Sequence, residues 1–432
     1  MSTFTTRPEI TGTFGVATST HWIATAVGMS ILEKGGNAFD ATVATALTLI
    51  VVEPHLNGFG GDMPAIFYSE KTGKVEVICA QGPAPKGATI AHYKAEGIDL
   101  IPGDGLLSTV IPGAFDGWML MLKTYGTMSV REVFEPAIGY ARDGHPLLPR
   151  VANTIKDLAG FFEKEWPTSH AHWLPGGKAP EAGKLFKQPE LARTWTRIVE
   201  AAEKVQGREA QSDAARDFFY RGEIAAEMCE WLKTAEVMDA SGSKHKAVLT
   251  AEDLAGYKAT IEAPLTYDYE GWTICKQGPW GQGPVFAQTL AILKHTNIAN
   301  MDPMGAEFVH TVIEAMKLAY ADREVYYGDP DFAEIPMEHL LSEAYNAERA
   351  KLITDQASME LRPGVVPGFE AQVALAMEIL GAQKGQAVYE PTMAHLATAD
   401  DKNTEKRGDT VHIDVIDRWG NMVSTTPSGG WL

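Results

Sequence analysis

The sequence predicts an α+β protein, because its strand-like and helix-like stretches fall into separate blocks along the chain. Residues 63–80 hold two β-rich runs around the turn sequence Lys71-Thr72-Gly73-Lys74, which predicts a hairpin. Residues 410–425 hold a second pair of alternating runs near the C-terminus. Between them, from about residue 114 to 235, amphipathic stretches bounded by glycine, proline or capping residues predict a series of helices.

Size and charge narrow the class of protein. With 432 residues, 45% of them hydrophobic, the chain suits one large domain or two closely joined ones. Its net charge of −19 argues against nucleic acid as a partner. The most apolar stretch, residues 41–52, is too short to span a bilayer, so no membrane partner is expected. Cys79, Cys229 and Cys275 form no CxxC pair, and no signal-peptide pattern is visible, which predicts a cytoplasmic protein.

Capping residues predict where further helices begin and end, near the N-terminus and around residue 250. Ile23, Val27 and Ile31 have helical spacing, and the Gly35-Gly36 pair predicts the end of that helix. Asn37 then suits the N-cap of a second helix, which should end at Pro54. Residues 250–253 have the Thr-x-x-Asp pattern of a capping box.

The segment around Thr410 joins a polar linker to a strand. Residues 398–409 are charged or small, and the apolar residues of 411–415 then alternate with Thr410, His412 and Asp414 on the opposite face. One interpretation is an edge hairpin with a polar outer face after a loop. The other is a nucleophile at a new N-terminus, because cleavage before Thr410 would free an α-amine that can deprotonate its hydroxyl. The pattern alone leaves both open.

Three other patterns carry weaker signals. Gly58-Phe59-Gly60-Gly61 lacks the Lys-Ser/Thr of a phosphate loop and favours a tight turn. His170 and His172 have no third ligand nearby, and neither do His412 and Asp414. The aspartates within 322–331 do not have calcium-loop spacing and favour a helix end. We therefore expect no metal and no cofactor.

Five long segments carry motifs in a fixed order: 35–62, 108–118, 249–265, 314–332 and 408–424. The first reads GGNAFDATVATALTLIVVEPHLNGFGGD, against a family block GGNAxDAAVA…VVEPxxxGxGGG, and the last reads GDTVHIDVIDRWGNMVS. Together the segments resemble the γ-glutamyltransferase family of N-terminal-nucleophile hydrolases. Only the middle of the chain, about 149–216, is unmatched.

This resemblance implies an αββα sandwich, made as a precursor that cuts itself between Asp409 and Thr410. Residues 1–409 would form the large subunit, and 410–432 would begin the small one. Thr410 falls on the family's nucleophile, with His412 following as a supporting residue. Ser428 replaces the family threonine that bonds the nucleophile's amine, and it keeps the hydroxyl. The implied partners are a small amide substrate and the protein's own small subunit.

Three departures from the family motifs concern the substrate. Gln81 stands where the family has an arginine that clamps the α-carboxylate of a γ-glutamyl group, and a neutral amide cannot replace a guanidinium. Gly430 stands where the family has an asparagine, and 278–284 replaces a segment rich in proline, serine and glycine. These changes resemble the branch with oxamate amidohydrolase-type enzymes, so we expect a self-processing hydrolase of a small amide.

Two alternatives stay open at this point. The first is a true γ-glutamyltransferase or glutathione hydrolase, in which Arg150 or Arg323 does the work of the missing arginine. The second is an inactive remnant, because the family's small subunit extends well beyond one hairpin. On that ground we expect the sequence to be truncated at its C-terminus.

Overall fold

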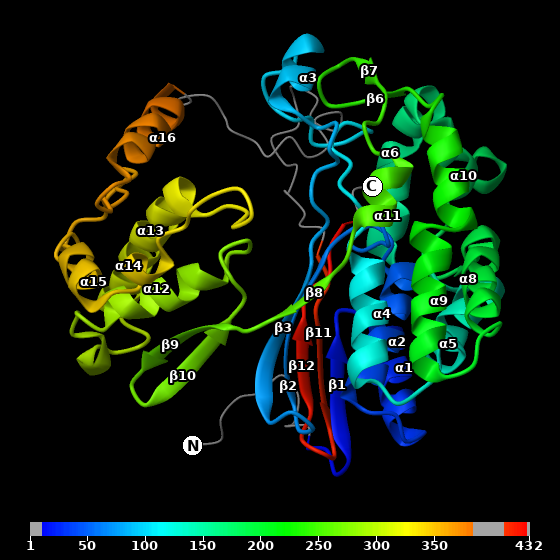
Figure 1. Ribbon diagram of the computed structural model, residues 1–432, viewed down its shortest axis with the longest axis horizontal. Coiled ribbons are helices and arrows are strands. Elements are labelled where there is room, and N and C mark those ends of the chain that lie inside the picture. The colour runs from blue at the N-terminus through cyan, green and yellow to red at the C-terminus, as the bar shows by residue number, and fades with distance from the viewer. Residues whose placement is uncertain (1–10, 383–409, 430–432) are drawn as a thin grey trace. The chain divides into compact units, whose positions relative to one another are not determined.

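The computed structural model describes residues 11–382 and 410–429, and the predictions for Asp409 and Gly430 lie outside these ranges. The chain forms two compact units (Figure 1). Unit 1 comprises residues 1–262 and 389–432, and unit 2 comprises residues 263–388. Each unit is described by itself below.

Unit 1 is built on a sheet in which the described strands pair in the order β1-β11-β12-β2-β3-β8, every pair antiparallel. The bounds are β1 (Gly15–Ser19), β2 (Met63–Ser69), β3 (Lys74–Ala80), β8 (Thr260–Glu262), β11 (Ile413–Asp417) and β12 (Met422–Thr425). Both hairpins expected from the sequence are present. The C-terminal one is not at an edge, however, because the red strands β11 and β12 lie between β1 and β2 (Figure 1).

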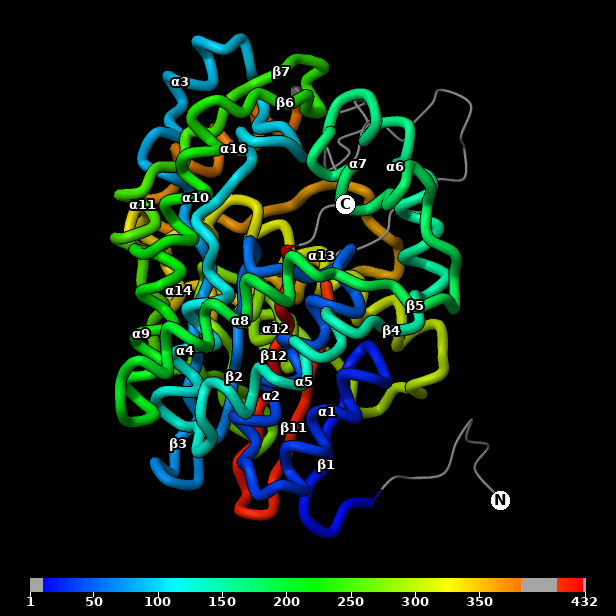
Figure 2. The backbone as a smooth tube through the Cα atoms, turned by 90° about the vertical axis from the view of Figure 1, so that its right-hand side faces the viewer, coloured from blue at the N-terminus to red at the C-terminus, as the bar shows by residue number. Residues whose placement is uncertain are grey.

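Helices cover one face of this sheet (Figure 2). The main layer contains α1 (Trp22–Glu33), α2 (Ala38–Val52), α4 (Ala114–Tyr125), α5 (Val130–Asp143), α8 (Pro189–Ala202) and α9 (Arg208–Tyr220). Every residue of α2 is buried, and it packs on the apolar side of β11, where Ile413 and Val415 are fully buried, as is Val411 just before the strand. On the opposite face of the sheet Ile416 and Met422 are about half exposed. Unit 1 thus shows the α+β class that the sequence predicts, as one helical layer on one antiparallel sheet.

The capping predictions are confirmed. Asn37 and Asp40 form a capping box at the start of α2, and Thr250 and Asp253 form another at α11 (Ala251–Gly256). Gly35 ends the first helix with a φ of +95°, a conformation that glycine adopts without strain.

Shorter elements complete unit 1. They are α3 (Ile90–Ala95), α6 (Pro149–Glu165), α7 (Pro167–Trp173), the 3-10 turn η1 (Pro175–Gly177), α10 (Glu223–Leu232), the strand pair β4 (His145–Pro146) and β5 (Leu185–Phe186), and the pair β6 (Val237–Met238) and β7 (Lys244–His245).

Unit 2 contains a hairpin and a group of helices. Its elements are β9 (Leu265–Tyr269), β10 (Trp272–Lys276), α12 (Gly283–Leu293), the 3-10 turn η2 (Ile298–Asn300), α13 (Ala306–Tyr326), α14 (Met337–Leu340), α15 (Glu343–Ala350) and α16 (Glu370–Ala382). Asp322 is fully buried and accepts hydrogen bonds from Gln288, Tyr345 and Arg349. It therefore holds α12, α13 and α15 together.

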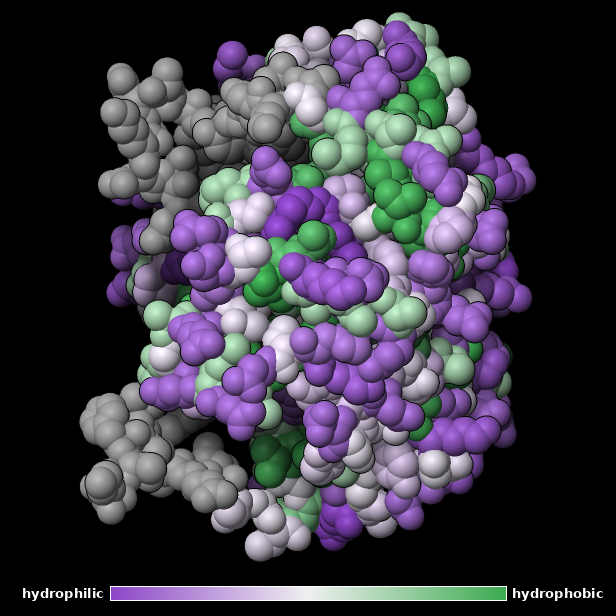
Figure 3. All heavy atoms as spheres, turned by 90° about the vertical axis from the view of Figure 1, so that its left-hand side faces the viewer, coloured by the Kyte–Doolittle hydropathy of each residue, from purple (hydrophilic) through white to green (hydrophobic). Residues whose placement is uncertain are grey.

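The surface in Figure 3 mixes hydrophilic residues with several separate hydrophobic patches. Across residues 11–382 and 410–429 no helix combines the length and apolar character that crossing a membrane requires.

The turn between β11 and β12 is fixed to the N-terminus of α2 by Asp417. One carboxylate oxygen accepts from the Ala38 amide at 2.8 Å and from the Asn421 side chain at 2.8 Å. The other oxygen accepts from the amides of Trp419 at 2.9 Å and Asn421 at 3.1 Å. Because the first amides of a helix have no partner within the helix, a buried carboxylate there satisfies both the amide and the helix dipole.

We predict that Asp417→Ala lowers the free energy of unfolding by about 2 kcal/mol or more, since hydrogen bonds to a charged group contribute about 1.5–3 kcal/mol. Urea unfolding of the full-length protein measures this change. Asp213→Ala is the matched control, because Asp213 is about half exposed and its pair with Lys123 should contribute less than about 1 kcal/mol. Equal losses in the two variants would contradict the role given to Asp417.

Candidate active site

Thr410 and Ser428 face each other across two strand ends of unit 1. The two residues form an isolated antiparallel bridge, and the Thr410 hydroxyl donates to the Ser428 hydroxyl at 3.3 Å. Thr410 is exposed, whereas its neighbour Val411 is fully buried beneath it. The strand alternation therefore presents the Thr410 hydroxyl on the face of the sheet that the helices do not cover.

The glycine-rich turn packs against the backbone of Ser428. Asp62 and Ser428 exchange both backbone hydrogen bonds at 3.2 Å, and the Gly61 carbonyl accepts from the amides of Gly113 and Ala114. A Cβ on Gly61 would lie 1.7 Å from the Ser428 carbonyl oxygen, so only glycine fits there. The expectation of a tight turn is confirmed by the hydrogen bond from the Gly61 amide to the Gly58 carbonyl, and this turn packs against the residue that pairs with Thr410.

His412 lies on the same face as Thr410 but is turned toward other partners. Its Nδ1 lies 2.9 Å from the Thr426 hydroxyl, and its Nε2 lies 3.0 Å from an Asp414 carboxylate oxygen. His412 therefore links β11 to the end of β12, and its two ring nitrogens are both used in doing so. Within the described ranges no group of three or more histidine, cysteine, aspartate or glutamate residues could hold a metal ion.

Gln81 lies beside Asp62 and forms hydrogen bonds with two neighbouring residues. Its amide nitrogen donates to an Asp62 carboxylate oxygen at 3.3 Å, and its backbone carbonyl accepts from the Tyr257 hydroxyl at 3.3 Å. Burial raises the pKa of Tyr257, and the charges of Asp116 and Asp62 raise it further, so this hydroxyl stays protonated as a donor. Sequence reasoning found Gln81 but missed Asp62, although Asp62 stands where the quoted family block has a glycine.

The two arginines considered as replacements have other partners. Arg150 is the second residue of α6, and its charge opposes the rise that burial causes in the pKa of Glu53. Arg323 is in unit 2, where it donates to Gln282 at 2.6 Å and stacks over the Tyr320 ring. His170 and His172 lie in α7, and burial lowers the pKa of His172.

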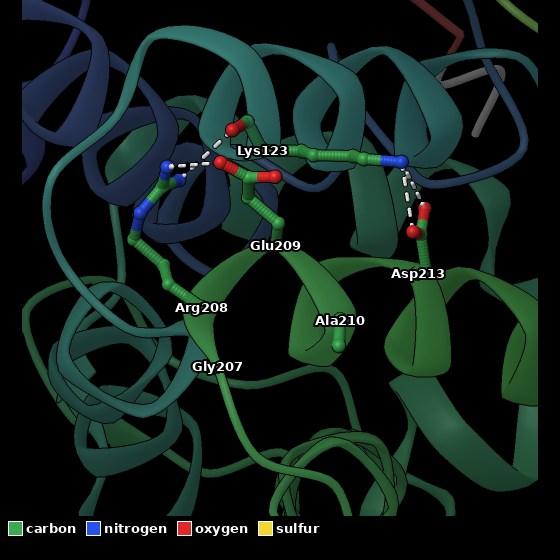
Figure 4. A pocket seen from close by; sticks show the side chains of 6 residues that line it. All are labelled: Lys123, Gly207, Arg208, Glu209, Ala210 and Asp213. Atoms are coloured by element: carbon green, nitrogen blue, oxygen red, sulfur yellow. Dashed lines mark hydrogen bonds and ion pairs between the residues drawn. The ribbon is translucent and has the colours of Figure 1, made fainter.

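A separate hollow lies at the N-terminus of α9 (Figure 4). It is lined by Lys123, Gly207, Arg208, Glu209, Ala210 and Asp213. Lys123 bonds both oxygens of Asp213, and Arg208 donates to the carbonyl of Lys123 at the end of α4. Lys123 and Arg208 thus hold the end of α4 against the start of α9. We assign no reaction to this hollow.

The sequence is similar to known proteins over almost its whole length. Residues 24–432 match the family model described as Gamma-glutamyltranspeptidase. The glutathione hydrolase proenzyme of Bacillus subtilis (strain 168) is 32% identical over 422 residues, which cover 96% of this chain and 64% of that protein. The chain therefore spans less than two thirds of the length of this relative.

Solved structures agree with that match. The structure titled LmbA2991HD is 45% identical with a TM-score of 0.85, covering 99% of this chain and 70% of that one. A cephalosporin acylase from Bacillus halodurans is 28% identical with a TM-score of 0.77, covering 99% of this chain and 68% of that one.

We predict that the full-length protein cuts itself between Asp409 and Thr410. Denaturing gels should show two fragments, and N-terminal sequencing of the smaller one should begin at Thr410. Thr410→Ala should leave a single uncut chain, because the hydroxyl that attacks the preceding peptide bond is gone. Thr273→Ala, which removes an exposed strand threonine of unit 2, should be cut normally. Cleavage that persists in Thr410→Ala would rule out this nucleophile.

Proposed function

Because the chain belongs to the gamma-glutamyltranspeptidase family, we propose that the protein is a self-processing amidohydrolase that works through an acyl-enzyme on Thr410. The observation that carries this proposal is the exposed Thr410 hydroxyl, 3.3 Å from that of Ser428, at the start of an interior strand. The relative from Bacillus subtilis is itself named a proenzyme, which agrees with processing before catalysis.

The proposed reaction needs only groups of the chain itself and water. After cleavage, the α-amine of Thr410 takes the hydroxyl proton while Oγ attacks the amide carbonyl. The protonated amine then gives its proton to the leaving nitrogen as the C–N bond breaks. Water, or an acceptor amine, resolves the ester by the same exchange of a proton with the α-amine. Ser428 keeps the Thr410 oxygen on the open face of the sheet throughout.

For the substrate we propose a small amide whose acyl group is compact, such as oxamate. The support is Gln81, a neutral side chain that already donates to Asp62 where the family motif has an arginine. The second candidate is a glutathione hydrolase, and the name of the relative from Bacillus subtilis favours it.

If the α-amine of Thr410 is the general base, activity should rise with pH. The base must be neutral, and peptide α-amines have pKa values of about 7.7–8.0, so kcat/KM should increase through that range. A pH profile of purified, fully cut protein measures this directly. Uncut precursor isolated before processing has no such amine and should be inactive. Equal activity of precursor and cut protein would exclude the α-amine.

We predict weak turnover of γ-glutamyl-p-nitroanilide and glutathione compared with oxamate. Loss of a charged bidentate contact costs about 2–5 kcal/mol, which corresponds to about 30-fold to several thousand-fold in kcat/KM. Gln81→Arg should shift the ratio toward γ-glutamyl substrates, but only in part. If the unmodified protein hydrolyses glutathione as well as oxamate, glutathione hydrolase is the better description.

A further inference from the structure

The segment that carries Thr410 extends beyond one of the two strands that flank β11. β1 pairs with β11 from Asp417 to Ile413, where Ser19 is the last partner. Residues 410–412 lie beyond that last pair, next to the end of β12. Val411 is fully buried on the helix side, but apolar contact has no preferred direction. Its burial therefore fixes how deep the segment lies and not where the polar side chains point.

Pro427 weakens the backbone pairing at this point. The register of the β11–β12 hairpin continues to the bridge between Thr410 and Ser428, which places Val411 opposite Pro427. The Val411 amide donates to the Pro427 carbonyl at 3.1 Å. A pair of this kind normally exchanges two hydrogen bonds, but proline has no N–H to return the second. The backbone thus supplies one bond where an ordinary ladder supplies two.

A chain of side-chain hydrogen bonds crosses the strands at the same place. His412 lies opposite Thr426, in the kind of antiparallel pair whose side chains come closest. Its Nδ1 lies 2.9 Å from the Thr426 hydroxyl, and its Nε2 lies 3.0 Å from an Asp414 carboxylate oxygen. The same Asp414 oxygen accepts from the Thr18 hydroxyl of β1 at 3.5 Å. The chain therefore ties the end of β11 to both of its neighbouring strands.

Asp414 determines how the His412 ring is used. A carboxylate only accepts hydrogen bonds, so the proton of the neutral ring lies on Nε2 and points at Asp414. Nδ1 is then an acceptor, and the Thr426 hydroxyl donates to it. The His412 side chain is about half exposed, so without Asp414 the ring is free to turn toward solvent. Asp414 thus selects the tautomer and the orientation in which His412 accepts from Thr426.

We propose that Asp414 and Thr426 are positioning residues, which act through His412 to keep Thr410 against Ser428 in the cut protein. This inference rests on the proposed acyl transfer at Thr410. Cleavage releases Thr410 from the residue before it, so the side-chain link then sets the direction of the strand end. The Thr410 and Ser428 hydroxyls are 3.3 Å apart, and a displacement of about 1 Å at a reacting group can cost about 100-fold in rate.

Steady-state kinetics of the full-length, processed protein test this role. The substrate is oxamate with ammonia release as the readout, or γ-glutamyl-p-nitroanilide where the wild type prefers it. Thr426→Val keeps the size and removes the hydroxyl, so kcat should fall about 10-fold or more while KM stays within about 2-fold. Thr426→Ser restores the hydroxyl and should stay within about 2-fold of wild type in kcat. An unchanged kcat in Thr426→Val would overturn the proposal.

Substitutions at Asp414 separate orientation from charge. Asp414→Asn keeps an oxygen that accepts from Nε2 and should stay within about 3-fold of wild type in kcat, whereas Asp414→Ala should lose about 10-fold. Asp414 is about half exposed, so both variants should fold, and urea unfolding checks this. A loss in Asp414→Asn as large as in Asp414→Ala would contradict a role in orientation.

Ser424→Ala is the matched control. Ser424 lies directly opposite Asp414 on β12, so this change removes a hydroxyl from the same face of the sheet but from outside the link. Its kcat and KM should equal those of the wild type. A loss in Ser424→Ala as large as in Asp414→Ala would show that any change on this face slows the reaction, and would overturn the proposal.

The double variant adds an independent readout. Two substitutions that break the same chain should not add, so Asp414→Ala with Thr426→Val should lie within about 2-fold of the slower single variant in kcat. Independent effects would instead multiply to about 100-fold. Losses that multiply in this way would contradict a single chain through His412.

The outcomes distinguish this inference from the function beneath it. Self-cleavage and turnover with the wild-type kcat in every one of these variants leave the amidohydrolase standing and remove the positioning role. A wild-type protein that neither cuts itself nor turns over an amide removes the amidohydrolase, and this inference with it.

Discussion

The fold of unit 1 depends on the insertion of the C-terminal hairpin into the middle of the sheet. β11 pairs with β1, about 400 residues away in sequence, and β12 pairs with β2, about 355 residues away. Among the described strands nothing else connects β1 to β2 and β3. Such pairing closes very long loops, and the buried apolar side of β11 against α2 supplies the compensating free energy.

Because the hairpin is inserted into the sheet, the proposed cleavage before Thr410 is compatible with an ordered site. A strand at an edge is held by hydrogen bonds on one side only, but β11 is paired on both sides. Cleavage before Thr410 would therefore free the amine while the strand that follows stays fixed by β1, by β12 and by the Asp417 bonds to α2. Thr410 would then gain local freedom and still keep its position on the open face.

The sequence predicted local features well and long-range neighbours poorly. The hairpins, the capping boxes and the glycine turn follow from spacing and residue type over a few positions. One of the two interpretations placed the C-terminal hairpin at a sheet edge, and that position was wrong, because alternation reveals a strand but not which strands flank it. Asp62 was missed for a related reason, since its place beside Ser428 comes from register between distant strands, although its contact with Gln81 lies within the predicted hairpin of β2 and β3.

Positions 62 and 81 have to be considered together in physical terms. A guanidinium at 81 next to a carboxylate at 62 would form an ion pair, and its charge would be largely cancelled for a substrate. A neutral amide at 81 can instead donate to Asp62 without adding a charge of its own. Glycine with arginine, and aspartate with glutamine, are thus two self-consistent pairs of residues for these two positions.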